Sequence, residues 1–448
     1  MKQVITILTL LMMPYFTPLQ AEDLITVYNQ AALEDPQLEK AREALGVVQE
    51  TQNQASASLF LPQATFSGNV NKDWQNVQFG GGQAVGTSGA SNFMFGGYTL
   101  NLTQPILHYD RIIQWQQADS RIAHAEAQFA ATESNLLLRV AERYFDVLAA
   151  GENLIYAQAQ QESLARKLKE TQQHEAAGYL AMTDVQEAQG GYDHAVADAL
   201  EAEHKLRDVR ESLLEVTGIN YTDLAILKDE IPLVQPDPNI EERWVDQALA
   251  QNLSLQVSEY ATQIAKSDID VQKAGHLPTL DATGSHGFQT TGGRFGSVDQ
   301  QDTIIGLSLN VPLYQGGQVN SRIREYEHRY RETLATLKQA QRSVHRAASQ
   351  AFLGVTAGIS RVKALQQTLR SSETAVKATE AGFRVGYRTP LDIIVAERER
   401  LSAQRDYTRA RYEYVLNTLR LKQAVGTLSP EDLAKVNGWL EQGSVTGR

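Results

Sequence analysis

Cysteine is absent from the 448 residues of this chain, and its absence excludes several kinds of chemistry. Without thiols the chain has no disulfide scaffold, no cysteine-ligated zinc and no thiol nucleophile. A lipoprotein anchor needs a cysteine at the mature N-terminus, so we expect no anchor of that kind.

Positive charge and catalytic motifs are also scarce. The 41 Lys and Arg residues face 53 Asp and Glu residues, and the formal net charge of −12 argues against a general nucleic-acid binder. The nine histidines form no His-Glu-x-x-His pair, and no phosphate-binding Gly-Lys-Ser/Thr loop or Gly-x-Ser-x-Gly elbow occurs. We therefore expect no enzymatic activity and no cofactor.

Only the first residues contain a long apolar run. Lys2, the apolar stretch Val4–Met13 and the small-residue site at Ala21 are typical of a secretory signal, so residues 1–21 are predicted to be a signal peptide. An anchor helix is the alternative, but a bilayer-spanning helix needs about twenty apolar residues. No later stretch reaches that length. If the exported chain crosses a membrane, it must do so as β-strands in a closed barrel.

Matching motifs indicate an internal duplication. The pairs occur in the same order: Leu61-Pro62 with Leu277-Pro278, Gly178-Tyr179 with Gly386-Tyr387, and Gly218 with Gly426. The predicted organisation is repeat 1 at 22–230, a proline-rich linker at 231–240, repeat 2 at 241–428 and a C-terminal segment at 429–448. We therefore expect the two repeats to contain the same elements in the same order.

Each repeat contains a predicted hairpin, at about 63–104 in repeat 1 and 279–311 in repeat 2, with a Gly-rich loop inside it. In the last strand Ile305, Leu307 and Leu309 alternate with Gly306 and Ser308. An apolar face backed by a Ser/Thr/Asn face is what a water-filled transmembrane barrel requires. A soluble, half-buried hairpin is the alternative.

Three further details of the hairpins matter. His286 is an exception on the apolar side, and Pro105 is predicted to end the first hairpin. Four strands cannot close a barrel, because the smallest closed barrels have about eight. Several chains would have to share one barrel, and the strand pattern alone does not choose between two, three and four.

Two proline-free stretches predict helices of unusual length, at 106–177 and 313–385. At about 1.5 Å per residue each would reach roughly 110 Å, far longer than a helix of a globular domain. Four companion helices of about half that length are predicted at Glu22–Leu61, Tyr179–Gly218, Trp244–Leu277 and Pro390–Gly426. Abundant alanine and a broad apolar face favour a wall of many helices over a plain dimeric coiled coil.

Several motifs resemble the TolC family of outer-membrane factors, in order from about Asp23 to Trp439. They include Gly275-His276-Leu277-Pro278-Thr279-Leu280-Asp281, Val311-Pro312-Leu313-Tyr314-Gln315-Gly316-Gly317 and Thr183-Asp184-Val185-Gln186. The resemblance implies an α+β membrane protein. Three chains, with four strands each, would form a 12-stranded transmembrane β-barrel. That barrel would continue into a long periplasmic α-helical barrel with a small mixed equatorial domain.

The resemblance also implies a function. It implies an outer-membrane exit duct for tripartite efflux and type I secretion, passively exporting drugs, toxins or proteins. The implied partners are two further copies of the chain, a periplasmic adaptor (membrane fusion) protein, an inner-membrane ABC, RND or MFS-type transporter, and outer-membrane lipid. Two alternative interpretations of the sequence are a self-contained porin and a periplasmic coiled-coil adaptor.

The resemblance assigns site residues at the two helix turns. The implied adaptor-contact tips are Ala177, Gly178, Tyr179, Val385, Gly386 and Tyr387, and the implied periplasmic gate is Thr183, Asp184, Phe383, Arg388 and Asp392. Arg388 is expected to pair with Asp184, and Asp392 to form an acidic ring. Alternatively, the glycines simply turn the chain.

Three positions depart from the family pattern. Ala177 stands where the family has Val, Phe383 where it often has Tyr, and Val395 where a second Asp ring can occur. The Phe383 change removes a hydroxyl, and the Val395 change removes a carboxylate. We therefore expect a gate that is less acidic and more loosely tied.

Overall fold

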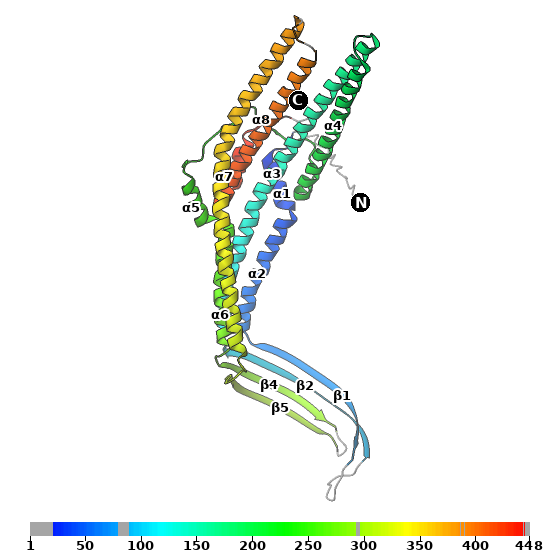
Figure 1. Ribbon diagram of the computed structural model, residues 1–448. Helices are drawn as coiled ribbons and strands as arrows, with labels where there is room; N and C mark the ends of the chain where they lie inside the picture. The colour runs from blue at the N-terminus through cyan, green and yellow to red at the C-terminus, as the bar shows by residue number, and fades with distance from the viewer. Residues whose placement is uncertain are drawn as a thin grey trace, which may run out of the picture. The chain divides into compact units, whose positions relative to one another are not determined.

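The computed structural model describes residues 21–78, 89–292, 296–385, 387–388, 390–441 and 443 (Figure 1). The chain forms two compact units, and each unit takes segments from both repeats. The first contains the described residues within 1–39, 131–252 and 344–448, and the second contains those within 40–130 and 253–343.

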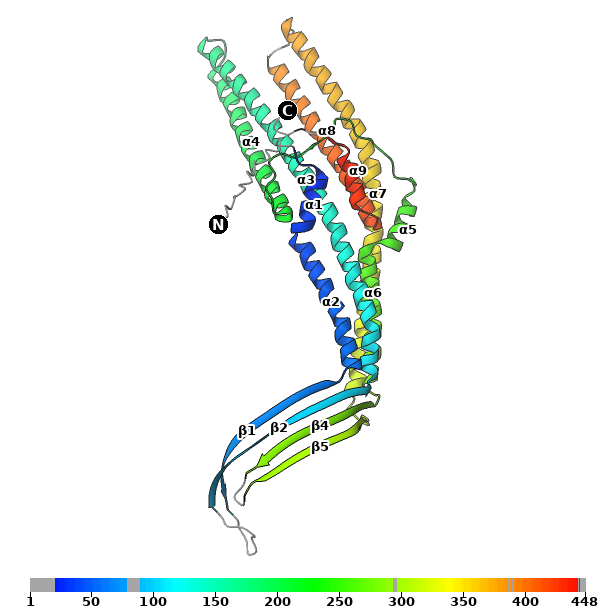
Figure 2. The same ribbon diagram turned by 180° about the vertical axis from the view of Figure 1, so that it is seen from behind.

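The second unit contains a four-stranded antiparallel sheet. Its strands are β1 (Gln63–Val77), β2 (Gly89–Leu107), β4 (Thr279–Thr291) and β5 (Val298–Asn310), in the order β1-β2-β4-β5. These strands lie side by side in both views (Figures 1 and 2). The β2–β4 pairing joins the two repeats, so the duplicated hairpins make one continuous sheet.

The first hairpin does not end at Pro105. Strand β2 continues to Leu107, and its pairing with β4 is irregular between Pro105 and Leu107. Proline cannot donate to the ladder, but a bulge already interrupts the ladder there, which lets the strand pass through it.

The register places the alternating residues on two consistent faces, because directly paired residues point the same way. One row contains Ala64, Leu102, Gly284 and Ile305. The next polar row contains Thr65, Asn101, Ser285 and Ile304. The four strands therefore share one apolar face and one polar face. Ile304 is an apolar exception on the polar face.

The apolar face contains one polar pair and an aromatic cluster. The Nδ1 atom of His286 lies 2.8 Å from the hydroxyl of Thr303, so its exceptional position is matched by a hydrogen-bond partner. Tyr98 lies between Phe66 and Phe288, with ring centroids 6.0 and 6.1 Å away. These contacts join strands β1, β2 and β4 on the same face.

The second unit also contains four helical segments that precede or follow its strands in the sequence: α2 (Pro36–Phe60), the first part of α3 (Tyr109–Ala176), α6 (Leu253–Ala274) and the first part of α7 (Gln318–Arg384). Arg111 donates to the carbonyl of Ser58 at 2.7 Å, which ties α3 to α2. Gln117 donates to the carboxylate of Asp268 at 2.7 Å, which ties α3 to α6.

Helices α3 and α7 have 68 and 67 residues. At about 1.5 Å per residue each is roughly 100 Å long. No helix in the described part of the chain has an apolar stretch suited to crossing a lipid bilayer. The companion helices α4 (Met182–Thr217) and α8 (Pro390–Val425) have 36 residues each.

Two companion stretches are broken, where the sequence pattern predicts single helices. Asp35 is extended between α1 (Leu24–Glu34) and α2, because Pro36 suits only the first turn of a helix. Asn252 is extended between α5 (Glu241–Gln251) and α6. Its side chain donates to the carbonyl of Ala424 at 2.8 Å, which holds this break against the end of α8.

In the first unit, buried side chains of α3 and α8 form hydrogen bonds with the segment between the two repeats. Tyr144 of α3 is fully buried and donates to the carbonyl of Ala225 at 2.7 Å. Tyr414 of α8 accepts from the backbone N–H of Val234 at 2.8 Å. Arg411 donates to the carbonyl of Lys228. These side chains hold the segment between the repeats against both helices.

That segment also pairs with the end of the chain. Strand β3 (Ile226–Leu227) is antiparallel to β6 (Leu440–Glu441). Helix α9 (Pro430–Asn437) is held by Asp432, which accepts hydrogen bonds from Lys422 and Lys435. These contacts attach a small mixed α/β layer to α8 in the first unit.

Candidate functional site

The turn between α3 and α4 is one of the two predicted tips. Gly178 has φ of +80°, a left-handed conformation that disfavours other residues, and the N–H of Tyr179 donates to the carbonyl of His174 at 2.9 Å. Tyr179 is 79% exposed. The turn therefore presents an aromatic side chain to its surroundings, and Ala177 is likewise exposed.

Asp184 occupies the third position of α4, and Thr183 precedes it as an exposed residue. The carboxylate of Asp184 accepts from the backbone N–H of Ala181 at 3.0 Å. A negative side chain in the first turn of a helix satisfies an unpaired N–H and suits the helix dipole. Asp184 therefore stabilises the start of its own helix.

The turn between α7 and α8 is the second predicted tip. Val385 and Tyr387 are 66% and 88% exposed, and Gly386 between them lies outside the described residues. The N–H of Tyr387 donates to the carbonyl of Gly382 at 2.8 Å. Phe383 is 43% exposed, so this tip also presents apolar side chains.

Arg388 contacts its own helix turn. Its Nη1 atom lies 3.9 Å from Oδ1 of Asp392. A Cβ atom on Gly382 would lie 2.8 Å from Cγ of Arg388, so the glycine leaves room for the arginine stem. Within the described chain the structure joins Arg388 to Asp392 and not to Asp184. The Arg388–Asp184 link stays a prediction for the assembled protein.

Helices α3 and α8 pack along a seam that leads away from the tips. Tyr412 donates to the carboxylate of Glu152 at 2.8 Å, and Arg420 donates to Glu142 at 2.7 Å. Burial, with the charge of Glu152, raises the pKa of Tyr412, so the phenol stays a donor. Burial also raises the pKa of Asp146, although the cation of Arg143 opposes it.

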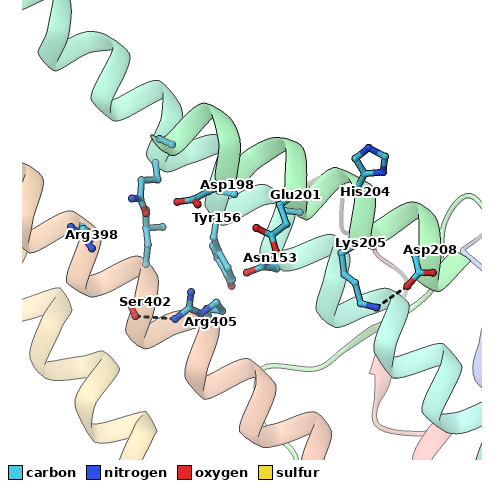
Figure 3. A pocket seen from close by; sticks show the side chains of 15 residues that line it. Asn153, Tyr156, Asp198, Glu201, His204, Lys205, Asp208, Arg398, Ser402 and Arg405 are labelled. Atoms are coloured by element: carbon cyan, nitrogen blue, oxygen red, sulfur yellow. Dashed lines mark hydrogen bonds and ion pairs between the residues drawn. The ribbon is translucent and has the colours of Figure 1, made fainter. Parts of the chain in front are cut away.

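A groove of about 820 Å³ lies among α3, α4 and α8 (Figure 3). Tyr156 of α3 lies between an acidic wall from α4, with Asp198 and Glu201, and a basic wall from α8, with Arg398 and Arg405. Lys205 and Asp208 form an ion pair of 2.7 Å at one end. The groove can therefore complement a surface that carries both signs of charge.

A smaller, more apolar cavity of about 290 Å³ lies between α3 and α8. Leu391, Ile394 and Val395 of α8 line it next to Asp392, a predicted gate residue, and Leu164 faces it from α3. No group of three or more His, Asp or Glu residues that could hold a metal ion occurs in the part of the chain that the structure describes.

The sequence pattern did not single out Gly382 or the residues of the large groove. Gly382 could have been noticed as a glycine inside a long helix, which usually has a packing reason. The groove residues carry ordinary surface charges on three separate helices. Only the packing of those helices brings them together.

Comparison with known proteins identifies the family of this chain. The family described as "Outer membrane efflux protein" matches residues 27–219 and 244–427, which together span both repeats. The chain therefore belongs to this family of channel-forming outer-membrane proteins. The resemblance to the TolC family and the expected outer-membrane location, with the helical barrel in the periplasm, are confirmed.

Among individual proteins, the chain is similar to TolC. It is 33% identical to outer membrane protein TolC of Vibrio cholerae serotype O1, covering 94% of each chain. It is 31% identical to TolC of Escherichia coli K12, covering 99% of this chain and 90% of that protein. It is 25% identical to the alkaline protease secretion protein AprF of Pseudomonas aeruginosa, covering 95% of this chain and 89% of that protein.

Solved structures confirm the fold. The outer membrane channel CmeC of Campylobacter jejuni has a TM-score of 0.74 at 16% identity, and the match covers 94% of this chain and 90% of that one. The match to the Neisseria gonorrhoeae channel MtrE in its open state has a TM-score of 0.65 at 17% identity and covers 91% and 90%. The predicted combination of a long helical barrel and a β-domain is the fold of these channels.

Proposed function

We infer that this chain is one protomer of a passive exit duct through the outer membrane, serving efflux and type I secretion systems. The observation that carries this proposal is the sheet of the second unit. It has one apolar face, one polar face and two edge strands, β1 and β5. Long unpaired edges are templates for pairing with another chain. A barrel in lipid removes every edge.

Three chains contribute twelve strands to the proposed barrel. The apolar face, which includes Phe66, Leu100 and Leu307, faces lipid in this arrangement. The polar face, which includes Thr99, Asn101 and Ser308, lines water. The proposed domains are the two repeats, 22–230 and 241–428, with 231–240 and 429–448 forming the equatorial layer. The pairing of β3 with β6 supports that layer.

The long helices continue the duct into the periplasm. The tips at 177–179 and 385–387 contact a periplasmic adaptor, and their exposed Tyr179 and Tyr387 supply large apolar surfaces for that contact. The groove among α3, α4 and α8 extends the same contact surface with its facing acidic and basic walls. The adaptor in turn recruits an inner-membrane ABC, RND or MFS-type transporter.

The gate of the duct lies at these tips. Asp392 of three chains forms an acidic ring that favours cations. Arg388, next to Asp392 in each chain, holds the ring closed, together with Thr183, Asp184 and Phe383. Val395, one helical turn further on and 52% exposed, adds an apolar ring where a second carboxylate is missing.

Two measurements test the proposal. Mass measurement in a mild detergent should give three chains, and the purified assembly should conduct ions in planar lipid bilayers. A stable monomer that conducts, or a trimer that does not, would contradict it. A porin is a poor alternative, because a porin needs many more strands and has no helices of nearly seventy residues.

A further inference from the structure

The polar face of the sheet contains an aromatic pair that the duct itself does not require. Phe93 is paired with Asp73, and Phe95 is paired with Asn71. Paired residues share a face, and Asn71 continues the polar row of β1. Both phenylalanines therefore lie on the same face as Thr99 and Asn101. Met94, between them, lies on the opposite face.

The two rings are held in place by the neighbouring strands. Their centroids lie 6.3 Å apart at an interplanar angle of 47°. A Cβ atom on Gly292 would lie 2.7 Å from Cδ2 of Phe93, so the glycine at the end of β4 makes space for this ring. Both rings are half-buried in the single chain. The ring of Phe93 is thus packed on one side and open on the other.

The carboxylate of Asp73 lies on the same face of the sheet as the two rings. Asp73 is half-buried next to Phe93, and no ion pair joins it to the part of the chain that the structure describes. The nearest cation in sequence, Lys72, lies on the other face, with its Nζ 5.1 Å from the ring centre of Trp74. The negative charge of Asp73 therefore remains available on the same side as the phenylalanines.

We propose that Asp73, Phe93 and Phe95 form a binding site for planar aromatic cations on the water-filled side of the barrel. The proposal rests on the proposed trimeric duct, in which this face lines the pore. Aromatic faces attract cations and stack on flat rings, and a carboxylate adds charge complementarity. Three copies place six rings and three carboxylates around the pore. In each chain they lie further from the helices than Val70, where the alternating apolar residues of β1 end.

Ethidium, a planar aromatic cation, is the probe. Fluorescence anisotropy of ethidium titrated with the purified trimer in dodecyl maltoside should show saturable binding. The double variant Phe93→Ser with Phe95→Ser should bind at least about tenfold more weakly, since stacking and cation–π contacts are lost. Asp73→Asn should weaken binding about fivefold and remove most of its dependence on KCl concentration.

Matched variants locate the site. Met94→Ser, on the opposite face of the same strand, and Asp246→Asn, at an exposed carboxylate of α5, should each change the affinity less than about twofold. The double variant Phe93→Leu with Phe95→Leu keeps apolar side chains against Gly292 and should still bind several times more weakly than the wild type. If the serine double variant does not assemble, the leucine double variant tests the site instead.

Three outcomes would overturn this site: wild-type affinity in the leucine double variant, equal losses in Met94→Ser and the serine double variant, or no saturable binding at all. Conductance in planar bilayers separates this failure from a failure of the duct. A trimer that conducts but does not bind ethidium refutes only the aromatic site. A trimer that does not conduct refutes the proposed function.

Discussion

The guanidinium of Arg388, just before α8, lies 3.9 Å from the carboxylate of Asp392 in the first turn of that helix. The two side chains are partly exposed, and a pair of this kind is worth only about 0.2–1 kcal/mol. Arg388 therefore partly neutralises the residue proposed to form the acidic ring. The same arginine is the proposed closing link, so charge and closure are coupled at one position.

Arg388→Ser should raise single-channel conductance in planar bilayers without disturbing trimer assembly. The reason is that three symmetric copies of the link together bias the gate by up to about 3 kcal/mol. Asp184→Ala should have a similar effect, and the double variant should add little because both changes remove the same link. The matched control is Arg370→Ser, which removes a charge from the exposed side of α7 away from the tip. Wild-type conductance in Arg388→Ser would place the gate elsewhere.

Gly382→Ala should weaken the gate through Arg388 alone. The added methyl would lie 2.8 Å from Cγ of Arg388, so the arginine must move while the helix, which favours alanine, remains intact. We expect a smaller rise in conductance than for Arg388→Ser. Adding Gly382→Ala to Arg388→Ser should have no further effect. A further increase in the combined variant would show that the glycine acts by another route.

Leu307→Arg should destabilise the folded barrel in lipid vesicles by about 2–4 kcal/mol near the bilayer midplane. Ser308→Arg should cost much less, since Ser308 lies on the polar face and is paired with Asp281. Urea unfolding of the two variants in vesicles measures the difference. Equal losses would mean that the apolar face does not contact lipid.

Tyr144→Phe should lower the free energy of unfolding by about 1–3 kcal/mol, because a buried carbonyl loses its donor. The hydroxyl of Tyr144 lies 2.7 Å from the carbonyl oxygen of Ala225, and both residues are buried. Tyr179→Phe, at the exposed tip, is the control and should leave the melting temperature unchanged. The same melting temperature for Tyr144→Phe would show that water replaces the lost donor.

Acid should weaken the attachment of α9 through Asp432. Burial alone would raise the pKa of Asp432, but hydrogen bonds and charge from Lys422 outweigh it and lower the pKa. A lowered pKa adds stability at pH values above the ordinary value near 4, and this stability is lost as the pH falls through the folded-state value. The melting temperature of Asp432→Asn should therefore be lower than wild type at pH 7 and approach it near pH 3. Asp246→Asn, exposed on α5, should behave like the wild type at both pH values.

The alternating strands and the long helices could be predicted because they depend on local periodicity. The register confirms that Ile305 and Leu307 share a face with the apolar residues of the other strands. Ile304 shows the limit of the pattern, since two adjacent isoleucines must point to opposite faces. The continuation of β2 past Pro105 depends on its pairing with β4, which a single segment does not reveal.

The helix breaks and the gate contacts were harder to predict, for a common reason. Asn252 leaves the helix where its side chain reaches Ala424, which is 172 residues away in the sequence. Asp184 is predicted to bind Arg388 in the assembled protein, and within one chain its carboxylate accepts from the N–H of Ala181 at the start of its own helix. A long-range partner determines the first case, and a local backbone donor determines the second. Neither leaves a periodic signal in the sequence.

The positions of the apolar residues on each strand also indicate how the strands are inclined to the membrane normal. Ala64 of β1 and Ile305 of β5 lie in the same row of paired residues across the four strands. From that row the apolar residues of β1 extend away from the helices, from Ala64 to Val70. Those of β5 extend toward the helices, from Ile305 to Leu309. The centre of the apolar band therefore shifts by about five residues, or roughly 17 Å, over three strand spacings of about 14 Å in total. A band parallel to the bilayer then requires strands inclined by about 50° to the normal, close to the slope found in closed transmembrane barrels. In the proposed barrel, the side chains of a single protomer thus fix the slope at which its strands cross the membrane.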